Sequence, residues 1–267
     1  MNRIEETFKR LKQKNETALV GFVTAGDPDI STSERIITGM CKSGLDILEL
    51  GIPFSDPTAD GPVIQRSSAR ALAQGVNTGK IIEITARIRK QTQVPIILFS
   101  YYNPIHAYGV AKFYHDAVVA GADGVLVVDL PPEESEEMTS QSQGHDLALI
   151  RLLAPTTPVE RMEYIAASAK GFLYMVSKTG VTGSDGLDTE AIRENIRRLR
   201  PCTKLPTCVG FGISTTEDVA AVAALAHGVV IGSAFEQLIE ENLDDAGLDR
   251  LLAQRVRTYK AATMNVL

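Results

Sequence analysis

The chain has 267 residues, of which 44% are hydrophobic and 22% are charged, and its formal net charge is −6. This length suits one large domain, and the composition is ordinary for a globular protein with a sizeable core. The negative charge argues against nucleic acid and against an anionic membrane surface as partners.

The first sixteen residues, MNRIEETFKRLKQKNE, form a charged amphipathic pattern without an apolar stretch. We therefore expect a helix here, and neither a signal peptide nor a membrane span. Cys41, Cys202 and Cys208 are scattered and form no CxxC pair. Their spacing predicts neither a zinc site nor a redox pair, and their odd number fits the reducing cytoplasm.

Short β-prone runs alternate with helical stretches along the chain. The expected strands are residues 18–24, 46–51, 95–100, 124–128, 147–153, 172–176, 206–209 and 228–231. The expected helices are residues 31–43, 63–73, 78–91, 110–120, 132–143, 159–169, 189–199, 215–224, 234–241 and 248–262. Eight β–α units of this length favour a (β/α)8 barrel, with residues 1–267 as one domain. A doubly wound open sheet is the alternative, but no GxGxxG pattern follows the first strand.

The segments that follow the expected strands differ from those that precede them. Residues 52–62 hold three prolines and two aspartates, and residues 177–188 hold three glycines. The opposite turns, such as Ser43-Gly44, are short. In a (β/α)8 barrel the loops after the strands carry the chemistry, so we expect the site at the carboxyl ends of the strands.

Glu49 is an acid inside the second apolar strand. Strand alternation places it on one face with Ile47 and Gly51. A carboxyl in apolar surroundings has a raised pKa and serves as a general acid or base near neutral pH. The alternative is a structural acid paired with a basic side chain, but no Lys or Arg is close in sequence.

The proline-rich loop adds two further carboxylates. Asp56 precedes Pro57 and suits a turn. Asp60 precedes Gly61-Pro62, where a catalytic role and a cap on the next helix are equally open.

Glycine-rich turns end the seventh and eighth strands. They read Gly210-Phe211-Gly212 and Gly232-Ser233, and a helix follows the second. Backbone N–H groups at such turns and the helix dipole favour a phosphate group. The alternative is that these glycines only permit tight turns.

Other candidate functional residues have weaker support from the sequence. Residues 179–186 suit a lid with glycine hinges, the alternative being a surface loop. The four histidines show no metal spacing and lie next to no nucleophile in sequence. Arg151 interrupts the fifth strand, and we expect it to face the helices with its head in a salt bridge or at the rim.

Several long motifs resemble those of the α subunits of tryptophan synthase over essentially the whole chain. They are GFVTAGDP, LELGIPFSDPTADGPVIQ, YYNP, VDLPPEES, APTTP, SKTGVTG, VGFGIS and GSA. The resemblance implies a (β/α)8 barrel with an extra N-terminal helix. The implied activity is a lyase reaction late in L-tryptophan biosynthesis, the reversible retro-aldol cleavage of indole-3-glycerol phosphate to indole and glyceraldehyde 3-phosphate. It implies no cofactor and no metal.

The resemblance also implies roles for single residues. Glu49, Asp60 and Tyr174 match catalytic positions. The apolar slot for the indole ring would comprise Phe22, Phe99, Leu126, Leu152 and Phe211. Phosphate binders would be Gly183, Gly212, Gly232 and Ser233, and Thr182 would meet Asp60 when the lid closes.

The partner implied by the resemblance is a β subunit that carries pyridoxal phosphate, in an αββα heterotetramer through which indole passes in a tunnel. Asp56, Pro57 and Asn103 would lie at that interface, where Thr58 departs from the usual pattern. Three other readings stay open: a stand-alone lyase, a non-catalytic phosphate-sensing partner of β, and a phosphosugar isomerase. The isomerase would be expected to have paired acids on the first and fifth strands, and the fifth has none.

Overall fold

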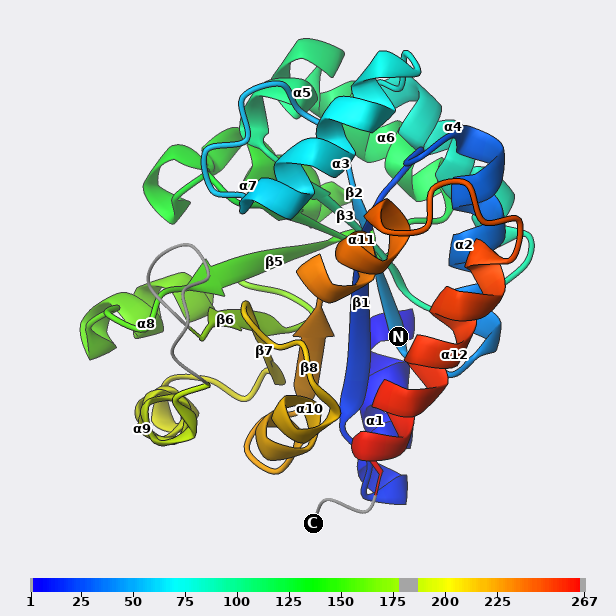
Figure 1. Ribbon diagram of the computed structural model, residues 1–267. Helices are drawn as coiled ribbons and strands as arrows, with labels where there is room; N and C mark the ends of the chain where they lie inside the picture. The colour runs from blue at the N-terminus through cyan, green and yellow to red at the C-terminus, as the bar shows by residue number, and fades with distance from the viewer. Residues whose placement is uncertain (1, 178–186, 265–267) are drawn as a thin grey trace.

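The computed structural model describes residues 2–177 and 187–264. Its strands form a closed parallel barrel in the order β1 to β8 (Figure 1). They are β1 (Ala18–Thr24), β2 (Ile47–Gly51), β3 (Ile96–Ser100), β4 (Gly124–Val127), β5 (Ala148–Leu153), β6 (Leu173–Val176), β7 (Thr207–Gly210) and β8 (Gly228–Ile231). Because β8 pairs with β1, the open-sheet alternative is wrong and the barrel is confirmed.

The helices lie around the barrel (Figure 1). They are α1 (Arg3–Lys14), α2 (Ile30–Lys42), α3 (Pro62–Ala73), α4 (Thr78–Arg89), α5 (Tyr102–Tyr108), α6 (Val110–Ala120), α7 (Glu136–Gly144), α8 (Val159–Ala167), α9 (Thr189–Leu199), α10 (Thr216–Ala223), α11 (Ser233–Glu240) and α12 (Leu248–Ala262), with 3₁₀ turns η1 (Pro132–Glu134) and η2 (Arg200–Cys202). None of the described helices combines the length and apolar character that a membrane crossing needs.

Most boundaries agree with the predicted ones within two residues, and two places differ. Helix α5 was not predicted, because its Tyr-Tyr-Asn-Pro start suggests a turn; Pro104 is tolerated there because it lies in the first turn. The predicted helix over 132–143 is instead η1 followed by α7, with the break at Ser135.

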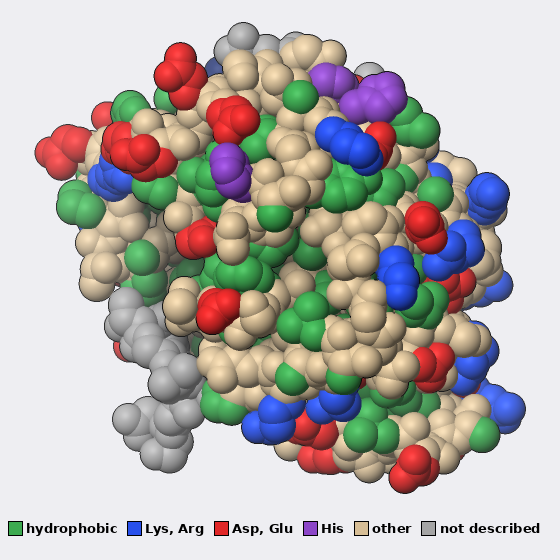
Figure 2. All heavy atoms as spheres, turned by 90° about the horizontal axis from the view of Figure 1, so that it is seen from above, with side chains coloured by type: hydrophobic (Ala, Val, Ile, Leu, Met, Phe, Trp, Pro, Cys, Tyr) green, Lys and Arg blue, Asp and Glu red, His purple; other side chains and the backbone are tan. Residues whose placement is uncertain are grey.

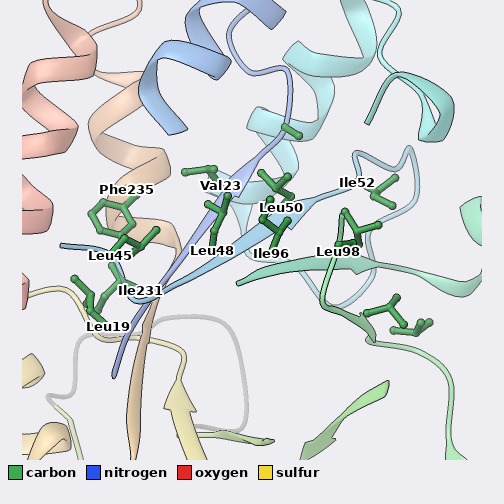
Figure 3. Close-up of a cluster of buried hydrophobic side chains, with 14 of the residues drawn as sticks. Leu19, Val23, Leu45, Leu48, Leu50, Ile52, Ile96, Leu98, Ile231 and Phe235 are labelled. Atoms are coloured by element: carbon green, nitrogen blue, oxygen red, sulfur yellow. The ribbon is translucent and has the colours of Figure 1, made fainter. Parts of the chain in front are cut away.

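Strand alternation divides the apolar side chains into two clusters. Leu48, Leu50 and Leu98 point outward and pack against the helices (Figure 3). Ile47, Ile97 and other residues point into the barrel. Glu49 lies between Leu48 and Leu50, so its carboxyl points into the interior as expected.

Helix α1 closes the amino-terminal end of the barrel. Ile4 and Leu11 are buried in the interior cluster, and the Phe8 ring lies 6.0 Å from that of Phe172. The N-terminal amphipathic pattern is therefore confirmed as a helix whose apolar face covers the bottom of the barrel.

Two buried aspartates near this end are fully paired. Asp46 accepts hydrogen bonds from the Leu19 amide at 3.0 Å and from Lys260 Nζ at 2.8 Å. Asp123 accepts from the Ile96 amide at 2.9 Å and from Arg89 at 2.8 Å. These carboxylates tie strands to each other and to the outer helices.

Candidate active site

A cavity of about 760 Å³ opens at the carboxyl ends of the strands. Its walls come from strand residues, from segments 58–64, 127–132, 211–213 and 232–233 at the ends of the strands and the starts of helices, and from α8. Figure 2 looks down on the molecule from above, and apolar side chains lie in the hollow near the centre of this view. The cavity has the size of a small-molecule site and lies where the loop pattern predicted it.

Glu49 projects from β2 into this cavity and is only 1% exposed. Its Oε1 atom has no hydrogen-bond partner among the described residues, so the alternative of a salt-bridged structural acid is not what the structure has. Burial raises the pKa of the Glu49 carboxyl to about 8. At neutral pH the group therefore holds a proton that it can donate into the cavity.

Tyr174 on β6 lies on the same interior surface. Burial, together with the charge of Glu49, raises the pKa of its hydroxyl well above the ordinary value. The hydroxyl therefore stays protonated and can donate a hydrogen bond. A Cβ atom at residue 210 would collide with this hydroxyl, so Gly210 makes room for it.

Asp60 lies in the loop between β2 and α3 and lines the cavity. Burial raises the pKa of its carboxyl to about 6, although a hydrogen bond from Tyr101 opposes the shift. The cap of α3 is Gly61 and uses no side-chain hydrogen bond, so Asp60 does not serve as that helix's cap.

Tyr101 supports the site from behind the lining residues, and the sequence reasoning missed this role. Its hydroxyl accepts a hydrogen bond from the Ala59 amide at 2.9 Å and also contacts the Asp60 carboxyl. It thereby fixes the loop that carries Asp60. The signal for it was present in the YYNP motif, but nothing local shows that the loop 42 residues upstream returns to this strand end.

Apolar side chains form a slot beside these acids. The rings of Phe22 and Phe99 meet edge to face, with centroids 5.1 Å apart, and Leu152 and Phe211 also line the cavity. Leu126 does not line it; this side chain is fully buried in the interior cluster. A flat apolar group fits such a slot.

The glycine-rich turns lie at another part of the wall. Gly212, Gly232 and Ser233 all line the cavity. Ser233 begins α11, and no side chain caps this helix end. Its first N–H groups and its dipole therefore favour an anion in the cavity. Thr182 and Gly183, together with the predicted lid, lie outside the described residues.

Arg151 differs from its prediction. It points toward α7, but its Nη2 atom donates to Ser135 Oγ at 2.5 Å, and no described carboxylate lies within ion-pair distance. The expected salt bridge is therefore wrong, and the residue is 4% exposed rather than at the rim. The hydroxyls of Ser135 and Thr139 take the place of an acid.

The remaining polar candidates form no second site. Among residues 2–177 and 187–264, no group of His, Cys, Asp and Glu side chains is arranged to hold a metal ion. His145 contacts the Gln141 carbonyl, and His227 accepts from the Thr207 amide. These two histidines have structural partners.

A buried proton donor, a second carboxyl, an apolar slot and an open helix N-terminus define a (β/α)8-barrel enzyme that performs acid–base chemistry on an anionic, partly aromatic molecule. The pattern of the family described as "Tryptophan synthase alpha chain" matches residues 8–264, and the chain belongs to this family. It is therefore a lyase that cleaves indole-3-glycerol phosphate in tryptophan biosynthesis.

Individual relatives and a solved structure are similar to this chain over nearly its full length. The chain is 66% identical to a tryptophan synthase alpha chain of Desulfosudis oleivorans over 263 residues, which cover 98% of this chain and 99% of the relative. It is 59% identical to that of Desulfatibacillum aliphaticivorans, with the same coverage. The crystal structure of tryptophan synthase subunit alpha from Legionella pneumophila has a TM-score of 0.90 at 39% identity and 98% coverage of each chain.

Proposed function

We propose that Glu49, Asp60 and Tyr174 carry out the cleavage of indole-3-glycerol phosphate in this cavity. The observation that carries the proposal is the Glu49 carboxyl. It is buried, unpartnered at Oε1 and protonated at neutral pH, and it faces the cavity. A structural acid would have a partner; a general acid needs its proton free.

The substrate has a flat ring and a phosphate, which suit the two ends of the site. The indole ring lies in the slot of Phe22, Phe99, Leu152 and Phe211, above Leu126. The phosphate binds at Gly212, Gly232 and Ser233, with Gly183 joining from the loop after β6. Thr182 of that loop covers the bound substrate next to Asp60.

The reaction then needs one proton to move in and one to move out. Glu49 donates its proton to C3 of the indole ring, and the positive charge that develops at the ring nitrogen faces the Asp60 carboxylate. The Glu49 carboxylate next takes the proton of the hydroxyl on the adjoining glycerol carbon. The O–H electrons form the aldehyde carbonyl, and those of the broken carbon–carbon bond restore the indole. Tyr174 donates a hydrogen bond to the glycerol chain.

We further propose that the chain works as a single domain in the cytoplasm, needs no cofactor of its own, and assembles with a β subunit carrying pyridoxal phosphate in an αββα complex. A structure of tryptophan synthase from Mycobacterium tuberculosis supports the pairing, with a TM-score of 0.90 at 32% identity. Asp56, Thr58 and Asn103 are exposed and accessible to such a partner, and Thr58 lines the cavity.

Indole release from indole-3-glycerol phosphate tests the proposal. We expect slow release by the purified chain alone and strong stimulation by an added β subunit. Fast release by the chain alone would favour a stand-alone lyase. No release in either case, with the phosphate ester still bound, would contradict the catalytic roles and favour a non-catalytic partner of β.

A further inference from the structure

Five ionisable side chains gather behind the phosphate end of the cavity, between β1, α3 and α11. They are Asp27, Arg66, Arg70, Glu236 and Glu240. Helices α3 and α11 lie side by side there (Figure 1). Glu236 is 0% exposed and Asp27 is 1% exposed. The proposed chemistry uses none of these groups.

Ion pairs account for four of the five. Arg70 makes two hydrogen bonds to Asp27, at 2.7 and 2.8 Å, and a third to Glu240 at 2.8 Å. Arg66 makes two to Glu240, both at 2.7 Å. Two cations and two anions thus neutralise one another. A negative charge on Glu236 would have no cation left to balance it.

Glu236 has the contacts of a neutral acid. Its Oε1 atom accepts the Thr24 amide hydrogen at 2.5 Å. Its Oε2 atom accepts no hydrogen bond from any described group, and the Asp27 carboxyl lies against it. Two adjoining buried carboxylates do not both ionise. A proton on Oε2 that is donated to Asp27 removes the repulsion and satisfies the atom, while Arg70 keeps the charge on Asp27.

Glu236 connects three of the elements that shape the substrate site, namely α11, β1 and α3. It lies in the first turn of α11, three residues after Ser233. Thr24, which it holds, ends β1 two residues after Phe22. The Thr24 hydroxyl lies 2.7 Å from that of Ser67 on α3, the helix that follows the Asp60 loop. Glu236 therefore fixes the phosphate turn relative to the slot and the acidic loop.

We propose that Glu236 is a positioning residue for phosphate binding, acting as a neutral acid that holds the N-terminus of α11 against β1 and α3. The proposal rests on the assignment of the phosphate to Gly232 and Ser233. Loss of its proton would place an unbalanced charge inside the cluster, push α11 away from Asp27, and displace the N–H groups that receive the phosphate.

The affinity for phosphate esters should fall when Glu236 ionises at high pH. Burial, together with the charge of Asp27, raises the pKa of Glu236 to about 8. Below that pH the proton is present and the phosphate turn is in place. Above it the acid ionises, so affinity for phosphate esters falls, by at most about tenfold per pH unit.

The test is the dissociation constant of glycerol 3-phosphate, measured by calorimetry on the full chain between pH 6.5 and 9.5. For wild type we expect a constant value up to about pH 8 and weaker binding above it. The E236Q variant keeps the shape and a hydrogen-bond donor toward Asp27 but does not ionise, so its affinity should stay level across the range. Glu49 titrates in the same range in both proteins, so their difference isolates Glu236.

A matched control and a second variant complete the design. E241Q removes an exposed charge just beyond the same helix and should follow wild type. E236L loses both hydrogen bonds and should raise KM at every pH with little change in kcat. Equal pH profiles for wild type and E236Q would overturn the proposal, and this comparison decides it even where E236L does not fold. Failure of wild type to bind the phosphate ester at any pH would instead refute the phosphate site itself, and this proposal with it.

Discussion

Asp46 immediately precedes β2 and Glu49 lies at the centre of this strand, three residues further on, and both are nearly fully buried. Asp46, at the amino end, has a lysine and a backbone amide as partners. Glu49, further along the strand, has an unpartnered oxygen and a raised pKa. The same chemical group thus stabilises one end of the barrel and stays reactive at the other.

The difference shows how the fold divides stability from catalysis. Paired acids near the amino end, with Asp123 as a second case, hold strands and helices together. In the cavity Glu49 keeps an unsatisfied oxygen, which lowers stability and leaves its proton available for transfer. Removing Asp46 should therefore affect folding, whereas removing Glu49 should affect chemistry.

The largest expected effect is that of Glu49→Gln on turnover. The amide keeps the shape but transfers no proton, so kcat should fall by roughly 10²–10⁴-fold. The affinity for glycerol 3-phosphate should stay close to wild type, because Glu49 lies away from the phosphate turn. Steady-state indole release measures the first and calorimetry the second. Substantial turnover would remove Glu49 from the mechanism.

The same variant sharpens the contrast through its stability. Because folding raises the Glu49 pKa from 4.5 to about 8, the folded protein binds more protons than the unfolded chain between these values. Wild-type stability therefore falls as pH rises through this window. Glutamine does not titrate, so Glu49→Gln should be more stable than wild type at pH 7, by about 1 kcal/mol or more. Lower stability at pH 7 would contradict the assigned neutral state.

Asp46→Asn should show the opposite behaviour. It leaves Lys260 half-compensated by Glu16 alone, so the free energy of unfolding should fall by about 3 kcal/mol. Since the chain has no tryptophan, circular dichroism in urea is the suitable measurement. The exposed Asp244→Asn is the control. Unchanged stability, or a loss of kcat in a folded variant, would break the comparison.

The pH profile of kcat/KM follows from the two acids of the cavity. Glu49 must hold its proton, so the rate should fall about tenfold per pH unit above pH 8; Asp60 must be ionised, so it should also fall below pH 6. The Asp60→Asn variant should have a lower kcat/KM, and this value should no longer fall below pH 6. If kcat/KM of this variant still falls below pH 6, a group other than Asp60 causes the fall.

The smallest expected effect is that of Tyr101→Phe. It removes the hydroxyl that holds Ala59 and Asp60, and kcat/KM should fall roughly three- to tenfold, as expected for one hydrogen bond. The neighbouring Tyr102→Phe is the matched control, because its hydroxyl donates to Glu137 at 2.6 Å on the exposed side. Equal effects of the two changes on kcat/KM would contradict the positioning role of Tyr101.

Features that depend on local pattern were predictable. Period-two alternation placed Glu49 on one face with Ile47, which the structure shows to be the interior face, and the spacing of apolar runs predicted eight strands. Features that depend on distant contacts were not. Tyr101 matters through a loop 42 residues away, and Glu236 through Thr24, 212 residues away. Neither partner is visible in any window of sequence, because the closure of the barrel brings them together.

Helix α1, which covers the bottom of the barrel, affects how substrate and product reach and leave the cavity. Ile4, Phe8 and Leu11 pack across that end, and the described residues that line the cavity lie toward the carboxyl ends of the strands. We therefore expect the substrate to enter and indole to leave through the carboxyl face. Whatever docks on that face controls both arrivals and departures, and a partner seated there receives the product directly.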